Sequence, residues 1–173
     1  MRRRAALVAL LPAAAAAERL EAPNVLPIRA DLVCSGQPTA AALKGLGGLG
    51  FDAVLYLAPA TVGDAVRDEP ELLRAQGIEF AHVPMPWDAP TLAQVDQVLD
   101  TLKRWQGQKR KVLVHCQVNM RASSLVFLYR ALVGGEDPEI AWADVTRIWR
   151  PNKTWSALIQ QALERGGLAF ELL

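Results

Sequence analysis

Short apolar runs alternate with longer amphipathic segments along most of this chain. The runs have the length of buried strands, and the segments repeat apolar residues at helical spacing. Strands that alternate with crossover helices form a mostly parallel sheet covered on both faces. The pattern therefore predicts an α/β fold with a mostly parallel central sheet flanked by helices. The expected strands are a short pair within 25–36 and single strands at 53–57, 80–83 and 111–115; the expected helices are 39–46, 69–76, 91–105, one directly after Arg121, 138–149 and 154–165.

The first 17 residues follow a different pattern. Three arginines, Arg2 to Arg4, precede a short apolar run, and an alanine-rich end follows Pro12. A positive start, a short apolar middle and an Ala-x-Ala end are typical of a secretory signal peptide. The apolar run is too short for a stable membrane span. We therefore expect residues 1–17 to be a signal peptide, residues 18–173 to form one domain, and the protein to be exported, into the periplasm; the alternative is an alanine-rich tail on a cytoplasmic protein.

Composition narrows the classes of partner. The chain has 173 residues, about half of them apolar, and a formal net charge of +1. Cleavage near Ala17 would leave 16 basic and 18 acidic side chains, a net charge of −2. No basic stripe interleaved with aromatic residues occurs, so we expect no nucleic-acid partner. His82 and His115 are the only histidines and belong to no ligand cluster, so the sequence implies no metal and no cofactor.

The most informative segment runs from Val112 to Ser124, where an apolar strand ends at Cys116 and a helix follows. Backbone N–H groups of such a loop and the positive end of the helix dipole favour an anion at this place. They also favour the thiolate, which is the nucleophilic form of cysteine. The side chain of Arg121 closes the loop with a planar fork of donors suited to phosphate or sulfate. The alternative is that Cys116 fills the core as a small apolar residue.

The loop residues that would surround an anion are Gln117, Val118, Asn119 and Met120. A loop curled around an anion needs a residue at positive φ, and Asn119 tolerates this conformation better than its neighbours. His115 precedes the nucleophile and is expected to tune it through hydrogen bonds.

The pattern His-Cys-x4-Arg-x-Ser after a strand resembles the phosphate loop of the cysteine-dependent protein-tyrosine and dual-specificity phosphatases. That superfamily usually has five residues between Cys and Arg, with a glycine among them, whereas four separate Cys116 from Arg121 and none is glycine. A group of small bacterial phosphatase-like proteins resembles this chain in the Cys-x4-Arg spacing and in an early Ser-Gly-Gln-Pro segment, here residues 35–38. Rhodanese-like sulfurtransferases also have a six-residue cysteine loop.

The resemblance implies a dual-specificity-phosphatase-like fold and a general acid in a loop before the cysteine strand. Asp88, in a proline-fixed loop after the strand at 80–83, matches this acid in type and place. Cys116 would attack phosphorus, Asp88 would protonate the leaving oxygen and then activate water, and Arg121 would hold the phosphoryl oxygens. Ser123 would donate to the sulfur, with Ser124 as a competitor. Asp88 also fits a simple turn or helix cap near Thr91.

Three functions stay open at this point. The first is a phosphatase acting on a phosphorylated protein, such as a phosphotyrosine protein, or on a small phosphate ester, through a cysteinyl-phosphate. The second is a rhodanese-like sulfurtransferase that carries a persulfide on Cys116 and does not need Asp88. The third is a catalytically inactive anion-binding domain. A disulfide between Cys34 and Cys116 is conceivable in an oxidising compartment, and Cys34 as a buried strand residue is the alternative. Trp87 either lines the pocket or anchors a hinge.

Overall fold

The computed structural model describes residues 20–172 and builds a five-stranded sheet between two layers of helices. The strand order is β1-β2-β5-β3-β4. β1 pairs antiparallel with β2, and all other neighbours are parallel. The prediction of a mostly parallel sheet in an α/β fold is confirmed. The strands are β1 (Leu26–Arg29), β2 (Leu32–Ser35), β3 (Ala53–Tyr56), β4 (Glu79–His82) and β5 (Val112–His115).

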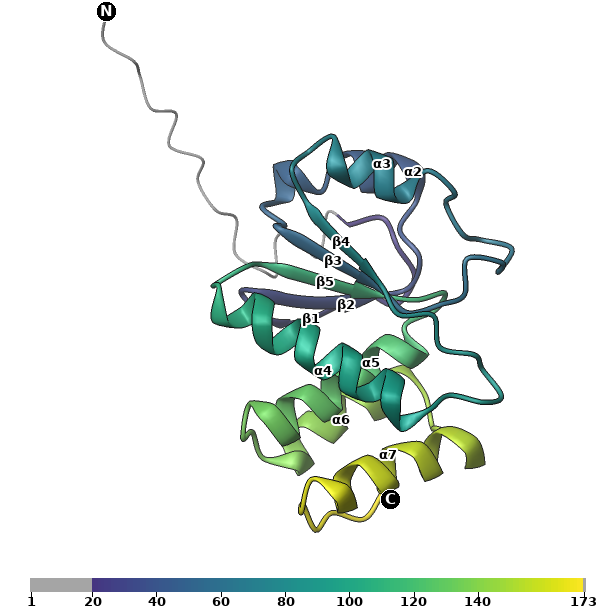
Figure 1. Cartoon of the computed structure of the whole chain (residues 1–173), viewed down its shortest axis with the longest axis vertical. Coiled ribbons are helices and arrows are strands. Elements are labelled where there is room, and N and C mark those ends of the chain that lie inside the picture. The colour runs from purple at the N-terminus through teal and green to yellow at the C-terminus, as the bar shows by residue number, and fades with distance from the viewer. Residues whose placement is uncertain (1–19, 173) are drawn as a thin grey trace, which may run out of the picture.

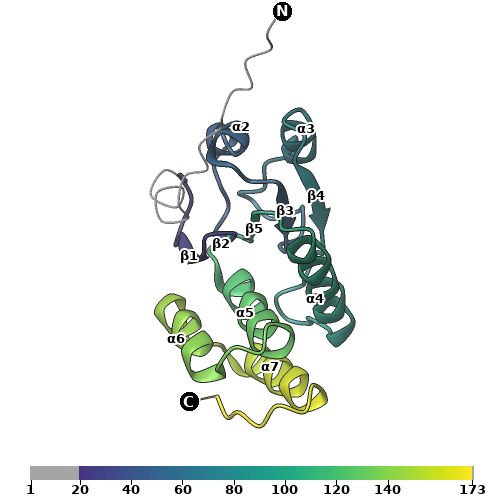
Figure 2. The ribbon, with the colours of Figure 1, turned by 90° about the vertical axis from the view of Figure 1, so that its left-hand side faces the viewer.

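The helices form two unequal layers. α2 (Ala40–Lys44) and α3 (Glu69–Arg74) cover one face of the sheet, together with the short turn η1 (Gly47–Leu49). The other face carries the longer helices (Figures 1 and 2). These are α4 (Leu92–Gly107), α5 (Met120–Leu128) with its wider π-type continuation η2 (Tyr129–Val133), α6 (Pro138–Ile148) and α7 (Lys153–Arg165).

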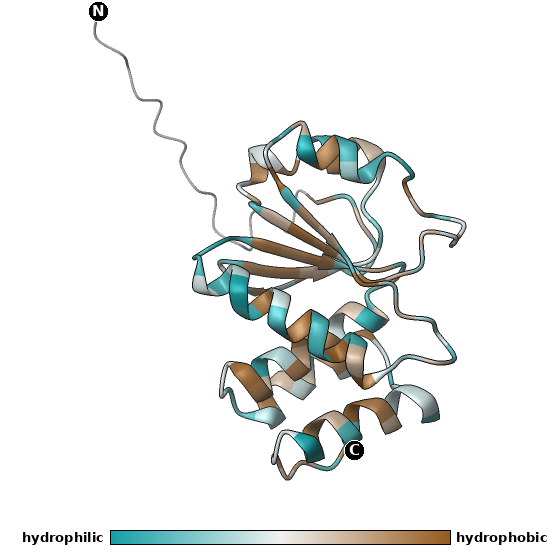
Figure 3. Cartoon of the chain, viewed as in Figure 1, coloured by the Kyte–Doolittle hydropathy of each residue, from teal (hydrophilic) through white to brown (hydrophobic). Residues whose placement is uncertain are grey.

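Both faces of the sheet are apolar because both are covered. Figure 3 shows strands that are mostly brown between helices in which teal and brown positions are mixed. β2, β3 and β5 are buried at every position. Successive side chains of a strand point to opposite faces, so one set packs against α2 and α3 and the other against the larger helical layer. Val33, Val54 and Leu113 belong to the first set, and Cys34, Leu55 and Val114 to the second.

The parallel register aligns the carboxyl ends of four strands. Ser35 pairs with His115, His115 with Tyr56, and Tyr56 with His82. These residues share a register row and therefore a face of the sheet. The loops that follow them all start at the same edge, which is where ligands bind in open α/β sheets.

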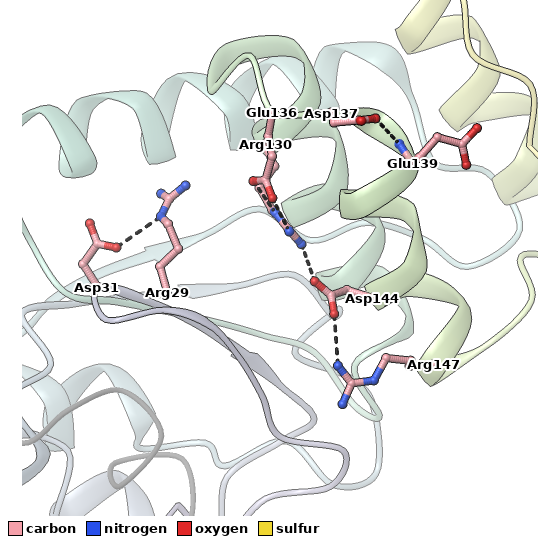
Figure 4. Close-up of polar contacts among 8 residues, drawn as sticks. All are labelled: Arg29, Asp31, Arg130, Glu136, Asp137, Glu139, Asp144 and Arg147. Atoms are coloured by element: carbon pink, nitrogen blue, oxygen red, sulfur yellow. Dashed lines mark hydrogen bonds and ion pairs between the residues drawn. The ribbon is translucent and has the colours of Figure 1, made fainter.

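An ion-pair cluster around the buried Arg130 joins η2 to α6. Arg130 is 4% exposed and donates to Glu136 and, at 2.6 Å, to Asp144, which also accepts from Arg147 (Figure 4). The hydrogen bond from Arg130 lowers the pKa of Glu136, and the same contact raises the pKa of Arg130. Because its charge is matched by two carboxylates, Arg130 is accommodated inside the larger helical layer.

Several predicted elements differ from the structure only at their ends. The helix expected after Arg121 begins at Met120, so Arg121 lies in its first turn. α4 begins after the cap Thr91, whose side chain accepts from the N–H of Gln94, and ends at Gly107. The leader predicted at residues 1–17 lies outside the described residues. Within residues 20–172, no helix is both long enough and apolar enough to span a bilayer.

Candidate active site

The loop between β5 and α5 begins at Cys116 and turns back on itself at Asn119, so residues 116–121 form a ring. Cys116 is 1% exposed. Asn119 has φ of +69° and stands at the N-cap of α5, as predicted for the residue that turns the loop back on itself. In the part of the chain that the structure describes, the N–H groups of residues 117, 118 and 120 have no backbone or side-chain acceptor. They remain available to an anion, at the positive end of α5.

The Ser-Gly-Gln-Pro segment supports this loop from behind. Gln37 N–H donates to the carbonyl of Gln117 at 2.9 Å, and Gly36 forms an antiparallel bridge with Val118. A Cβ on Gly36 would lie 2.5 Å from the Gln117 carbonyl oxygen and 2.8 Å from Cβ of Pro23. Both distances are far inside van der Waals contact. Glycine is thus required at position 36 for the close approach of two backbones.

A second support comes from Asn24. Its side-chain amide donates to the Val118 carbonyl at 3.0 Å, and the Asn119 side-chain amide donates back to the Asn24 carbonyl at 2.7 Å. Asn24 itself has a positive φ of +49°. The two asparagines therefore hold residues 118 and 119 from the segment before β1. No periodic pattern in the sequence indicates this pairing, which joins residues 95 positions apart.

Arg121 connects the cysteine loop to the loop after β4. Its Nε donates to the Met85 carbonyl at 3.0 Å, and its Nη1 donates to Oε1 of Gln117 at 3.4 Å. The guanidinium lies 5.1 Å from the ring centroid of Trp87, a cation–π distance. Arg121 is 5% exposed. Within the described chain its Nη2 has no acceptor, so one arm of the fork remains available for a phosphoryl oxygen.

A cavity of about 220 Å³ lies against the cysteine loop, and Cys116 itself is not among its walls. Its walls are Trp87, Gln117, Val118, Met120 and Arg121. The structure thus brings the predicted anion-binding residues together, with Asn119 buried beneath them. Trp87 lines the cavity and also fixes its loop to the helical layer. Its ring packs on Trp149 and Trp155, and its carbonyl accepts a hydrogen bond from Nε1 of Trp155 at 3.0 Å.

Asp88 lies next to this cavity in sequence but is not among its walls. Its side chain is exposed and, within the described residues, has no hydrogen-bond or ion-pair partner. The loop that carries Asp88 nevertheless contacts the site, because the Met85 carbonyl accepts a hydrogen bond from Arg121 and the Trp87 ring packs against the Arg121 guanidinium. The capping alternative does not apply to α4, which is capped by Thr91 with Gln94. The role of Asp88 as general acid stays a prediction.

Within the described residues, the hydroxyl of Ser123 does not contact the sulfur of Cys116, and its expected role stays a prediction. Ser123 Oγ donates to the Met120 carbonyl at 3.2 Å, and Ser124 Oγ donates to the same carbonyl at 2.8 Å. Both positions follow Arg121 by more than one residue, so the helix turns their hydroxyls back onto its own first turn.

His115 has a partner that the sequence did not indicate. Its Nε2 lies 2.6 Å from Oε1 of Glu69, the first residue of α3, and Gln37 Nε2 donates to the other oxygen at 3.1 Å. Tyr56 stacks between His115 and His82, with ring centroids 4.7 and 4.8 Å apart. Burial is the main reason that the pKa of Tyr56 is raised to about 12. The signal available in the sequence was only an acidic residue at the start of a helix, which is common on surfaces.

Cys34 is a buried free thiol in β2, and Cys116 is also free. The structure thus places Cys34 as a buried strand residue and contains no bond between the two sulfurs. Burial raises the pKa of Cys34 to about 12, with the hydrogen bond to Asn119 as a smaller opposing effect. Cys34 therefore stays protonated at neutral pH.

Comparisons with known proteins extend these observations. No family model matches the chain, and no curated protein matches it either. Among solved structures, it is similar to a protein from Shewanella putrefaciens CN-32 assigned as a phosphatase (DUF442). Two crystal structures of that protein give 26% and 25% identity and TM-scores of 0.71 and 0.76, over 84% and 87% of this chain and 92% and 97% of theirs.

A more distant likeness concerns the fold. The active form of Tk-PTP is 24% identical with a TM-score of 0.65, over 83% of this chain and 95% of its own. Three observations agree with one another: the α/β fold with helices on both faces of the sheet, the Cys116 to Arg121 loop at the carboxyl edge of that sheet, and the likeness to the Shewanella protein. Together they show that the chain resembles the cysteine-dependent protein-tyrosine and dual-specificity phosphatase superfamily in its fold and in its cysteine loop.

Proposed function

We propose that this protein hydrolyses phosphate monoesters by means of a cysteinyl-phosphate intermediate on Cys116. The observation that carries the proposal is the set of free N–H groups at residues 117, 118 and 120 in the loop that begins at the buried Cys116 and ends at Arg121. Such a loop binds a tetrahedral oxyanion and holds it in line with the sulfur.

In the first half-reaction, the Cys116 thiolate attacks phosphorus. The S–P bond forms while the bond from phosphorus to the leaving oxygen breaks, and the carboxyl proton of Asp88 passes to that oxygen. Arg121 and the loop N–H groups stabilise the charge that develops on the three equatorial oxygens. Trp87 supports this arrangement by holding the guanidinium from one side.

In the second half-reaction, water attacks the cysteinyl-phosphate and releases inorganic phosphate. The P–O bond to water forms, the S–P bond breaks, and the thiolate of Cys116 is restored. The cavity of about 220 Å³ against the cysteine loop accommodates a phosphoryl group and part of a leaving group. We propose a phosphorylated protein or a small phosphate ester as the substrate class.

The experiment measures hydrolysis of p-nitrophenyl phosphate by the mature protein under reducing conditions, with Cys116→Ser and Asp88→Asn as variants. We expect loss of turnover in Cys116→Ser and a reduction of about 100-fold in Asp88→Asn. Turnover by Cys116→Ser equal to wild type would refute the thiol mechanism.

The six-residue loop is the specific observation that favours the second candidate, a sulfurtransferase. That reaction transfers sulfane sulfur to Cys116 and requires no proton donor. A thiosulfate-to-cyanide transfer assay therefore separates the two functions. Transfer activity that depends on Cys116 but not on Asp88, without phosphate release, would replace the phosphatase proposal. Phosphate binding without turnover of either substrate would instead indicate an anion-binding domain.

We also propose that the protein acts in the periplasm after removal of residues 1–17. The support is the arrangement of Arg2 to Arg4, the apolar run and the alanine-rich end. Amino-terminal sequencing of the full chain expressed in a bacterial host tests this. A start near Glu18 in the periplasmic fraction is expected, and an uncleaved cytoplasmic protein would contradict it.

A further inference from the structure

A second carboxylate reaches the cysteine loop from a different part of the chain than Asp88. Asp64 lies in the segment between β3 and α3, and its Oδ1 accepts a hydrogen bond from Nε2 of Gln117 at 3.2 Å. Oε1 of the same Gln117 accepts from Nη1 of Arg121 at 3.4 Å. A continuous path of carboxylate, amide and guanidinium therefore runs from Asp64 to the anion-binding fork.

The segment that carries Asp64 is fastened to the sheet edge. Nε2 of His82 lies 2.7 Å from the Ala58 carbonyl, and the Tyr56 hydroxyl donates to the Pro59 carbonyl at 3.4 Å. Two turns then follow, closed by the N–H groups of Val62 and Ala65. These contacts hold the backbone on both sides of Asp64. The segment starts at the sheet edge where the rings of His115, Tyr56 and His82 are stacked.

The two carboxylates suit different proton transfers. Oδ1 of Asp64 accepts a hydrogen bond from the side chain of Gln117, and a general base is likewise a proton acceptor. The side chain of Asp88 is exposed and makes no polar contact within the described chain, so no contact holds it away from a leaving oxygen. A proton donor is required in the first half-reaction and a proton acceptor in the second.

We propose that Asp64 is the general base of the second half-reaction, which rests on the proposed phosphatase function. When a phosphoryl group occupies the ring, Nη1 of Arg121 turns to its oxygens and frees Oε1 of Gln117. The freed amide oxygen accepts one hydrogen of the attacking water, and the Asp64 carboxylate takes the other as a proton. The water oxygen bonds to phosphorus, the S–P bond breaks with its electron pair on sulfur, and Asp64 later returns the proton to solvent.

Rapid mixing of the mature protein with p-nitrophenyl phosphate separates the two half-reactions. The initial burst of p-nitrophenol measures attack by Cys116, and the later steady rate measures hydrolysis of the intermediate. The variants are Asp64→Asn and Asp88→Asn, with Asp68→Asn as the matched control. Asp68 is an exposed acid of the same segment, and its side chain makes no capping hydrogen bond to α3. Mass spectrometry of acid-quenched protein measures the phosphorylated fraction.

We expect Asp64→Asn to keep the burst rate of the wild type and to lower the steady rate by about 100-fold, the contribution of a positioned base. The phosphorylated protein should accumulate, whereas Asp68→Asn should match wild type. Asp88→Asn should slow the burst instead. An Asp64→Asn variant with an unchanged steady rate, or with a slowed burst and no accumulated phosphoprotein, would overturn the proposal. The absence of any phosphoprotein in wild type and variants, with Cys116→Ser fully active, would refute the phosphatase mechanism itself.

Discussion

Oε1 of Glu69 lies 2.6 Å from Nε2 of His115, and both side chains are buried, with 2% and 0% of their surface exposed. His115 immediately precedes the nucleophile, and Glu69 opens α3 on the opposite face of the sheet from the long helices. Gln37, from the segment that supports the loop, donates to the second oxygen of Glu69. The pair thus ties three separate parts of the chain together behind Cys116.

Replacement of Glu69 by Gln should lower the free energy of unfolding by roughly 2 to 3 kcal/mol, because a buried hydrogen bond to a charged group is lost in part. Denaturant unfolding measures this. Glu71→Gln is the control, since Glu71 is an exposed acid in the same first turn and shares the helix-dipole contribution. Equal effects of the two substitutions would show that the His115 contact contributes no stability.

Substitution of Gly36 by Ala should displace the cysteine loop, because the added Cβ would meet the Gln117 carbonyl oxygen at 2.5 Å. We expect weaker vanadate binding by at least about 10-fold together with lower thermal stability, since backbone atoms must shift. Gly48→Ala serves as the control, because nothing lies within 4 Å of a Cβ at that position. Isothermal titration calorimetry measures the vanadate affinity. An unchanged affinity in Gly36→Ala would show that the close approach of Gly36 does not support the cysteine loop.

Asn119 should tolerate glycine better than alanine, although both substitutions remove the hydrogen bond to the Asn24 carbonyl. The difference arises from its φ of +69°, which costs alanine about 1 kcal/mol more than glycine. Thermal unfolding monitored by circular dichroism should therefore order the proteins as wild type, Asn119→Gly and Asn119→Ala. An alanine variant at least as stable as the glycine variant would argue against the left-handed conformation.

Stability should fall as the pH rises above about 9. Burial raises the pKa of Cys34 from 9.0 to about 12 and that of Tyr56 from 10.0 to about 12. Between these limits the unfolded chain loses protons that the folded chain retains, so alkali favours unfolding, by up to about 1.4 kcal/mol per pH unit for each group. Below pH 9 both groups are protonated in both states and contribute no slope.

Cys34→Ala isolates one part of this effect. The variant should lack the decline that begins near pH 9 and keep the smaller one that begins near pH 10, where Tyr56 is the remaining group. Urea unfolding at several pH values between 7 and 11 measures both slopes. A Cys34→Ala protein with the alkaline slope of wild type would mean that Cys34 is not the group responsible.

The fold was predictable because the pattern of apolar residues within each short segment indicates whether that segment forms a strand or a helix. The apolar runs at 53–57 and 111–115 and the amphipathic segment at 91–105 have periodicities that only one kind of element satisfies, and the alternation of the two kinds implies a parallel sheet. The cysteine loop was predictable for the same reason. Its nucleophile, its arginine and its positive-φ asparagine lie within six consecutive residues, Cys116 to Arg121.

The rest of the site was decided by tertiary structure alone. Glu69, Asp64 and Asn24 come to the loop from other elements, and in the sequence each looks like an ordinary surface or turn residue. Their positions depend on strand register, which places Ser35, Tyr56, His82 and His115 in one row and brings the following loops to one edge. A spacing pattern carries no information on which distant polar groups will meet there. The sequence by itself thus determined the sheet and its nucleophilic loop, and packing of the sheet determined which carboxylates reach that loop.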